Sequence, residues 1–366
     1  MLITFDETCS VRLWVDVVTP KAARVLWALL DYVREAELLV TTRQYREVES
    51  LLHTLEIEAE VVGKHGGGSL EGKLLAYADR VKALAKIVLR FEPEASFPIQ
   101  SVEASRVSFG LGIPFVLMND SPHAEAVARL TVPLARYLYT PFCIPKRAWT
   151  RFGIAAERIV QYRCIDPAIW IRKGPVDRAL ATAIPEDLIL VVMREEEYQA
   201  HYLAGVGRSP LEEVLYALSK LDLRDQLFVF YICRYKARPR IRKPRGLRVV
   251  FSRPGVDSIA LLQRASLFVG AGGTMTWEAA LMGVPSIDVF PGARTYVGRY
   301  MNRRKLVLSV RRVTPSLLKR LLSEETRMIW KRRASTILRS FENPLPQIVK
   351  RLEELAEEGR VLRSSV

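Results

Sequence analysis

Short apolar runs alternate with amphipathic stretches along almost the whole chain, and this alternation limits the possible folds more than any other feature. Short apolar runs are typical of buried strands, and the stretches between them have helical spacing. Strands are expected at residues 11–17, 38–40, 58–62, 95–99, 114–118 and 136–140, and again at 188–193, 227–232, 248–251, 267–270, 285–290 and 307–310. A β-α-β-α order predicts parallel sheets covered by helices on both faces.

Helices are expected between these strands. They are predicted at residues 22–33, 45–55, 69–91, 102–111 and 123–134, and then at 210–221, 258–263, 275–282 and 315–322. Thr19-Pro20 is typical of a helix start, because threonine caps the helix and proline suits its first position. Two further helices, at 324–340 and 345–358, are expected to be separated at Asn343-Pro344.

The chain has 366 residues, which suggests two domains. Proline and glycine interrupt regular structure between residues 165 and 185, so we place the domain boundary there. The predicted parts are residues 1–168, residues 169–340, and a C-terminal helix and tail at 341–366. Each domain is expected to be a doubly wound, Rossmann-like α/β domain. Such sheets bind ligands at the carboxyl ends of their strands, so we expect a cleft between the two domains.

Positive charge is concentrated in the second half of the chain. The net charge is +15, and residues 1–170 contribute none of it, since they hold 20 basic and 20 acidic side chains. The densest basic run contains Arg234, Lys236, Arg238, Arg240, Arg242 and Lys243. This run is predicted to be a solvated loop or a contact for an anionic membrane surface. Nucleic acid is a weaker alternative, because no RNA-binding signature accompanies the run.

Composition excludes several classes of protein. The chain is 49% hydrophobic and 26% charged, which is ordinary for a folded globular protein. No apolar run reaches the roughly 20 residues that span a bilayer, and the first ten residues carry Asp6 and Glu7 without a basic start. We expect a cytoplasmic location, with peripheral attachment to a membrane as an alternative. The four cysteines form no C-x-x-C pair, so no metal site is predicted.

A glycine-rich segment carries the clearest chemical signal. Gly270, Gly272 and Gly273 lie within four residues, directly after an apolar strand, and Thr274 is predicted to cap the helix that follows. Glycines let a ligand approach the backbone, and a helix start offers N–H groups and the positive end of a dipole. Glu278, one turn into the helix, is placed to accept hydrogen bonds from a ribose. The alternative is a tight turn whose glycines serve packing alone.

A second set of candidates follows the predicted strand at 114–118. Asn119, Asp120 and His123 lie just beyond its carboxyl end, where open α/β sheets bind ligands. A carboxylate and an imidazole there suit removal of a proton from an acceptor hydroxyl. The alternative is that Asp120 caps a helix and His123 is merely exposed.

Three more segments of the first half offer candidate side chains. Lys64, His65, Gly66 and Gly67 form an exposed, glycine-rich loop before a long predicted helix. His65 is a further candidate base, and the other three residues are candidates for holding an acceptor. Asp16 ends the first predicted strand and Glu103 follows the fourth, so both are candidate acceptor contacts or, alternatively, a cap and an ion pair.

Residues 270–285 resemble the nucleotide-diphosphate loop of the GT-B proteins, which include two-domain glycosyltransferases and the non-hydrolysing UDP-GlcNAc 2-epimerases. In those families a glycine-rich turn holds the diphosphate and a following glutamate holds the ribose. The resemblance therefore implies that Gly272, Gly273 and Thr274 hold a diphosphate and that Glu278 holds a ribose.

Seven short segments together are similar to the domain-of-unknown-function family 354 (DUF354), which is widespread in archaea. They are residues 14–16, 63–67, 103–107, 110–114, 119–123, 129–131 and 270–278. Relatives tend to carry His-Gly-Ser after the fourth strand, where this chain has Pro98-Ile99-Gln100-Ser101. The epimerases use a histidine after the first strand of the second domain, where residues 192–196 contain none. The resemblance implies a GT-B-like fold more strongly than a reaction.

Three functions remain open at this point. The first is a GT-B-type glycosyltransferase that takes a nucleotide-diphosphate sugar and an unidentified acceptor, with a lipid-linked acceptor at the membrane as one form of it. Such an enzyme needs no cofactor or metal, since a helix N-terminus and basic side chains stabilise the leaving diphosphate. The second is an epimerase of sugar nucleotides. The third is a non-enzymatic binder of nucleic acid or an anionic membrane.

Overall fold

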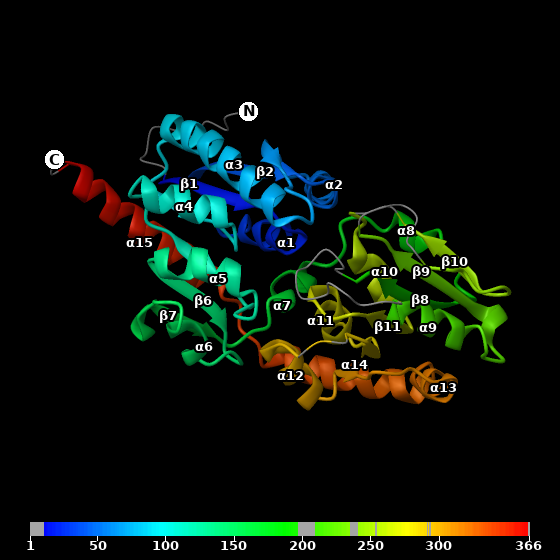
Figure 1. Cartoon of the computed structure of the whole chain (residues 1–366). Helices are drawn as coiled ribbons and strands as arrows, with labels where there is room; N and C mark the ends of the chain where they lie inside the picture. The colour runs from blue at the N-terminus through cyan, green and yellow to red at the C-terminus, as the bar shows by residue number, and fades with distance from the viewer. Residues whose placement is uncertain are drawn as a thin grey trace. The chain divides into compact units, whose positions relative to one another are not determined.

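Two parallel sheets, one in each half of the chain, organise the structure (Figure 1). The computed structural model describes residues 11–196, 209–234, 241–252, 255–290, 292 and 294–364. It contains two units. Unit 1 comprises residues 1–170 and 342–366, and unit 2 comprises residues 171–341. The last helix, α15 (Leu345–Ser364), belongs to unit 1, where it packs on β1, β4, β5 and α1.

The strands of unit 1 follow the order 3-2-1-4-5-6-7. A four-stranded sheet and a three-stranded sheet meet at a parallel bridge between Ser96 and Phe115. The strands are β1 (Val11–Val17), β2 (Ala36–Gln44), β3 (Glu60–Lys64), β4 (Ala95–Phe97), β5 (Val116–Met118), β6 (Tyr137–Pro141) and β7 (Ile159–Tyr162). All of their pairings are parallel, so their carboxyl ends lie at one edge.

Helices connect these strands as the sequence predicts. The longer ones are α1 (Pro20–Leu29), α2 (Arg46–Thr54), α3 (Leu70–Phe91), α4 (Val102–Gly110) and α5 (Glu125–Thr131), and single turns of helix form α6 (Arg147–Thr150) and α7 (Pro167–Trp170). Thr19 caps α1 as predicted, because its hydroxyl accepts a hydrogen bond of 3.1 Å from the N–H of Ala22. Strand β7, half of whose four residues are buried, is absent from the sequence prediction.

The sheet of unit 2 has the strand order 10-9-8-11-12-13, the same Rossmann order 3-2-1-4-5-6 that begins unit 1. Its strands are β8 (Ile189–Arg194), β9 (Leu227–Ile232), β10 (Arg248–Phe251), β11 (Leu267–Gly270), β12 (Ser286–Asp288) and β13 (Val307–Ser309). Its helices are α8 (Ala179–Thr182), α9 (Pro210–Leu218), α10 (Ser258–Arg264), α11 (Thr274–Leu281), α12 (Tyr296–Arg303), α13 (Pro315–Leu321) and α14 (Glu324–Arg339). The sequence prediction omits α12, whose polar side chains lower its mean hydropathy.

Strand β8 shows why both faces of this sheet are covered. Val191 and Met193 enter one apolar core with residues of α9 and α13, whereas Leu190 and Val192 enter a second core with α10 and α11. Successive side chains of a strand point to opposite faces, so a continuous apolar run requires a helical layer on each face. The predicted α/β class with two Rossmann-like domains is confirmed.

Two searches of the described residues give negative results. None of the helices there has the length and apolar character needed to cross a membrane. Within the same ranges, no three histidine, cysteine, aspartate or glutamate side chains are grouped as a metal site requires.

Candidate functional site

The glycine-rich turn of unit 2 connects β11 to α11 at the carboxyl edge of the sheet. Gly272 and Gly273 have φ angles of +75° and +88°, in the left-handed region that other residues rarely adopt. A Cβ atom at Gly273 would meet no atom within 4 Å, so the backbone there faces open space. The turn therefore exposes its main chain in the way that a ligand-binding loop requires.

The start of α11 differs from that of its neighbours. Its N-cap is Gly273, with no capping side chain, so the prediction that Thr274 is the cap was wrong and Thr274 is the first helical residue. In the described part of unit 2, every other helix of seven or more residues is capped by a Ser, Thr or Asp side chain. The first N–H groups of α11 thus point out of the helix without a side-chain cap, at the positive end of its dipole.

Glu278 lies one turn into α11 and is buried, with 4% of its surface exposed. Its Oε2 lies 3.4 Å from the hydroxyl of Ser258, the first residue of α10. This contact brings together the starts of two helices that both begin at the carboxyl edge of the sheet. The carboxylate predicted to hold a ribose is therefore beside the N-terminus of α10 as well as that of α11.

Asp288 supports the glycine turn from the end of β12. Its Oδ1 accepts a hydrogen bond of 2.9 Å from the N–H of Phe290, and the backbone of Gly272 also hydrogen-bonds to its carboxylate. Burial raises the pKa of Asp288, although these backbone N–H groups and Arg294 oppose the rise. Asp288 was not among the predicted residues, because the strand was expected to run from 285 to 290 and Asp288 lies inside that range.

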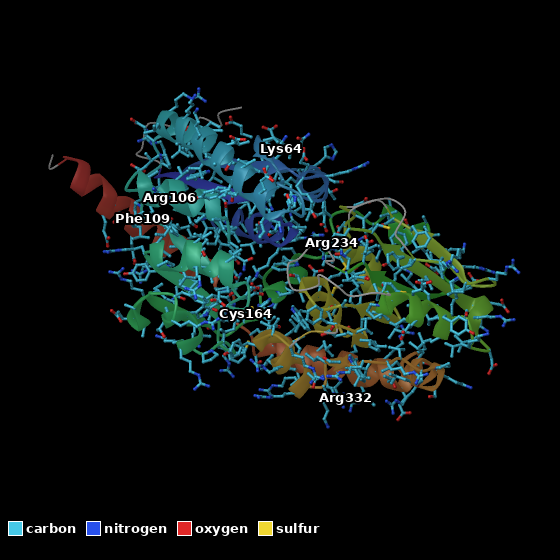
Figure 2. The ribbon with its side chains drawn as sticks, in the orientation of Figure 1. Lys64, Arg106, Phe109, Cys164, Arg234 and Arg332 are labelled. Atoms are coloured by element: carbon cyan, nitrogen blue, oxygen red, sulfur yellow. The ribbon has the colours of Figure 1, made fainter. Side chains whose placement is uncertain are left out.

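Only part of the predicted basic run can be placed. Lys236, Arg238 and Arg240 lie outside the described residues. Arg242 and Lys243 are exposed, and the N–H of Arg234 donates a hydrogen bond of 2.6 Å to Glu195, which follows β8 (Figure 2). Glu195 is itself buried.

In unit 1, Asp16 ends β1 and is fully buried against Arg80 of α3. The guanidinium donates two hydrogen bonds to the carboxylate, at 2.9 and 2.6 Å, and Thr41 donates a third at 2.6 Å. Burial alone would raise the pKa of Asp16, but Arg80 and the hydrogen bonds hold it below its usual value. The carboxylate therefore forms its bonds inside unit 1, and none of its surface is exposed to solvent.

Glu103, in the first turn of α4, lies beside the same arginine. Its Oε2 is 3.8 Å from Arg80, and its Oε1 is 4.0 Å from Arg43, the next-to-last residue of β2. The two predicted acceptor contacts Asp16 and Glu103 are therefore brought together, but through a buried network of charges.

A second buried network surrounds Lys21, near the start of α1. Its ammonium lies 2.7 Å from Asp120, which follows β5, and 2.5 Å from Asp166, which precedes α7. Asp166 also accepts a hydrogen bond from the hydroxyl of Tyr162. Burial alone would raise the pKa of Asp120, but the Lys21 ammonium lowers it below its usual value, whereas burial raises the pKa of Asp166. Sequence reasoning missed Lys21 and Asp166, which come from distant parts of the chain.

The remaining predicted residues of this edge form a hydrogen-bonded group around Asn119. Its side-chain oxygen accepts bonds of 2.8 Å from both the Gln100 side chain and the N–H of Ser121. His123 is exposed and lies within the electrostatic influence of Asp120. The atoms packed around its imidazole lower the pKa of His123 below its ordinary 6.5, with Lys21 adding to the shift and Asp120 opposing it. The ring is therefore neutral at pH 7.

The loop that follows β3 holds His65 in a fixed orientation. Its ring stacks on Tyr45 with 5.1 Å between ring centroids, and its Nδ1 accepts a bond of 3.0 Å from the N–H of Gly67. Gly66 lies against the first turn of α3, where a Cβ atom would come within 2.5 Å of the backbone oxygen of Gly72. Lys64, the last residue of β3, is exposed. The Nδ1 acceptor implies that the proton of a neutral His65 is on Nε2.

Known proteins share this architecture. A UDP-GlcNAc 2-epimerase from Neisseria meningitidis, solved with bound UDP-GlcNAc, aligns with 95% of this chain and 100% of its own, with a TM-score of 0.62 and 14% sequence identity. The spinosyn forosaminyltransferase SpnP aligns with 96% of this chain and 100% of its own, with a TM-score of 0.61 and 16% identity. These likenesses establish a GT-B-like fold with two Rossmann-like domains.

Sequence comparison identifies relatives as well. An uncharacterized protein from Methanocaldococcus jannaschii is 27% identical over 302 residues, which cover 80% of this chain and 85% of that protein. Residues 11–357 match the family described as protein of unknown function (DUF354), nearly the whole chain. The chain therefore belongs to the DUF354 family, as its motifs predict.

Proposed function

We propose that the chain is a glycosyltransferase that binds a nucleotide-diphosphate sugar at the turn 270–274 and transfers the sugar to an acceptor. One observation carries the proposal, namely that α11 begins at two left-handed glycines with no capping side chain. Backbone N–H groups at such a helix start bind phosphate, and the glycines let the anion approach. The structural neighbours include a protein solved with UDP-GlcNAc, which supports a nucleotide sugar as the ligand.

Transfer of the sugar moves negative charge onto the diphosphate that leaves. The bond between the anomeric carbon and the diphosphate oxygen breaks, and the acceptor oxygen forms a bond to that carbon. Negative charge grows on the departing diphosphate, where the N–H groups of Gly273 and Thr274 stabilise it without a metal, whereas the backbone of Gly272 is bonded to Asp288. Glu278 accepts hydrogen bonds from the ribose hydroxyls and so fixes the nucleotide.

A base must take the proton of the acceptor hydroxyl. His123 suits this role best among the candidates, because it is exposed, its lowered pKa keeps it neutral at pH 7, and Asp120 is near enough to stabilise the imidazolium that forms. The carboxylate of Asp120 forms an ion pair with Lys21, so its role is to stabilise the charged form of His123 and not to take the proton itself. His65, stacked on Tyr45, is the second candidate base.

Epimerisation, the alternative shared by several structural neighbours, is less well supported by the residues present. Strand β8 ends at Arg194 and is followed by Glu195, and both residues are buried. Arg194 donates a hydrogen bond of 3.0 Å to the carbonyl of Cys233, and Glu195 accepts one from Arg234. Neither is a neutral imidazole that could move a proton on the sugar.

A second candidate function is attachment to an anionic membrane, where a lipid-linked acceptor would be found. Residues 294–341 contain fourteen lysines and arginines but only Glu324 and Glu325 as acids. Exposed cations near a membrane contribute about 1 kcal/mol each to binding at an anionic surface. Flotation with anionic and with neutral vesicles tests this idea, and equal recovery with both would count against it.

The donor is tested by thermal unfolding with UDP-, GDP-, ADP- and dTDP-sugars, and with a CMP-sugar, which carries a single phosphate, for comparison. Glu278→Gln is the variant and Glu212→Gln is its control. Glu212 lies in the first turn of α9, at a distance in sequence from the proposed site. A ligand at 100 times its dissociation constant stabilises the folded state by about 2.7 kcal/mol. We expect one nucleotide to stabilise the wild type and the control but not Glu278→Gln, and no stabilisation by any of the five would contradict the proposal.

The base is tested once a donor is known. Single-turnover release of the nucleotide in the presence of candidate acceptors measures the chemical step, and His123→Ala should slow it by a factor of about 10² to 10⁴. In the wild type the rate should fall on the acid side below pH 6.5, the ordinary pKa of histidine. An unchanged rate and pH profile in His123→Ala would show that His123 is not the base, and His65 would then be the candidate.

A further inference from the structure

Helix α3 carries an apolar surface that unit 1 leaves uncovered. It is the longest helix described, with 22 residues, yet only Arg80, Leu84 and Val88 are buried. Leu70, Leu74 and Leu89 are 70%, 66% and 61% exposed. Helix α3 lies on the outside of unit 1 beside α4 (Figure 1). Exposed leucines grouped in this way are typical of a protein–protein interface.

The apolar residues of α3 form one continuous stripe. It consists of Leu70, Leu74, Ala78, Val81, Ala85 and Leu89, whose spacings of four, four, three, four and four residues place them on one side of the helix. Val81 and Ala85 are partly exposed, because they also pack against the core of unit 1. Phe109, which is 57% exposed at the C-terminal end of α4, adds a further apolar side chain to the same layer of helices (Figure 2).

We infer that this stripe binds the same stripe of a second copy of the chain, with the two α3 helices antiparallel. The stripe is symmetric about its middle. A two-fold axis between residues 79 and 80 places Leu70 opposite Leu89 of the partner copy, Leu74 opposite Ala85, and Ala78 opposite Val81. The small alanines at the centre allow the helices to approach closely, and large leucines close both ends. This self-complementary pattern is what a two-fold interface requires.

Charge selects the antiparallel arrangement. The exposed flank of the stripe carries Glu71 and Asp79 in the N-terminal half of α3 and Lys82 and Lys86 in the C-terminal half. Antiparallel packing brings Glu71 of one copy close to Lys86 of the other. Parallel packing would instead place the charged flanks of the two copies on opposite sides of the interface, where Glu71 and Lys86 could not pair. Attraction between opposite charges therefore favours the antiparallel arrangement.

The pair Glu71–Lys86 gives a sharp test. The two residues are 15 positions apart on one helix, which at about 1.5 Å per residue separates them by about 22 Å. They therefore cannot pair within a copy, and any energetic coupling between them must act between copies. We would measure the dimer dissociation constant of the full chain by sedimentation equilibrium for the wild type, Glu71→Lys, Lys86→Glu and the double variant.

We expect the wild type to be a dimer, each single reversal to weaken it at least threefold, and the double variant to recover most of the loss. Leu89→Asp should weaken it at least tenfold. Met328→Asp serves as the control, because Met328 is also 61% exposed but lies on α14 of unit 2. Circular dichroism confirms that each variant is folded. A monomeric wild type, a dimer that Leu89→Asp leaves intact, or single reversals whose effects simply add would each overturn the inference.

Discussion

The Arg80 guanidinium donates hydrogen bonds to both carboxylate oxygens of Asp16, at 2.9 and 2.6 Å, and neither side chain is exposed to solvent. The guanidinium also donates a bond of 2.8 Å from Nε to the carbonyl of Val62 in β3. Through these bonds one side chain of α3 connects the carboxyl ends of β1 and β3. The pair thus fixes the edge of the sheet on which the candidate residues of unit 1 are placed.

Loss of either partner should destabilise unit 1 strongly. Arg80→Met leaves the Asp16 carboxylate buried without its counter-charge, and breaking such a pair costs about 3–5 kcal/mol. We expect this loss in the free energy of unfolding measured with urea. The double variant Arg80→Met/Asp16→Asn should lose less than Arg80→Met alone, since it does not leave the charge of Asp16 buried without its partner. A double variant as unstable as the sum of the two single variants would show that the two side chains do not act as a pair.

The pair should also make stability depend on pH in the acid range. Because the folded pKa of Asp16 is held below 3.8, its ionised form stabilises the fold fully above that value. The contribution disappears as the pH falls through the lowered folded pKa. We expect the stability advantage of the wild type over Asp16→Asn to be constant from pH 7 to 5 and to shrink below pH 4. An advantage that does not change down to pH 2 would be inconsistent with a titrating pair.

The two carboxylates around Lys21 should differ in their tolerance of substitution. The pKa of Asp120 is lowered and that of Asp166 is raised, so the folded state retains the charge of Asp120 more readily. At pH 7, Asp166→Asn should therefore lower the free energy of unfolding less than Asp120→Asn does. Urea unfolding of both variants measures the difference, and the opposite ranking would reverse the assignment of the main charge partner of Lys21.

Cys143, which follows β6, should react slowly with alkylating reagents. Burial, together with the Asp166 and Asp120 carboxylates, raises the pKa of its thiol to about 12. The thiolate, which is the reactive form, is then scarce at pH 8. Alkylation by iodoacetamide, followed by mass spectrometry of the peptide that contains Cys143, should be far slower than for a model peptide and faster in Asp166→Asn. Equal rates in the variant and the wild type would show that Asp166 does not influence the thiol.

The fold could be predicted from the sequence because its signal is local. An apolar run such as Leu190–Met193 is a strand that is buried on both faces, and alternation with helices then requires parallel sheets. The elements that were missed have weak local signals. Strand β7 is short and only half buried, and α12 has few apolar residues outside its buried side.

The site could be predicted only where neighbouring residues build it. The turn at 270–274 and Glu278 form one continuous segment, so their order along the chain places them together. The partners of Asp16 and Asp120 come from α3 and α1, 64 and 99 residues away along the chain. No spacing rule links such distant positions, and the sequence alone therefore presented Asp16 as a candidate acceptor contact and Asp120 as a candidate for removing the acceptor proton.

The central claim is that the backbone of the glycine turn binds the diphosphate of a nucleotide sugar. Gly273→Ala and Gly174→Ala form a matched pair, because both glycines belong to unit 2, have φ angles of +88° and +81°, and face open space. An added methyl group is strained at both positions, because both φ angles are positive. Isothermal titration with the donor that stabilises the wild type should show binding to Gly174→Ala and at least tenfold weaker binding to Gly273→Ala. Equal affinity of the two variants would contradict the account.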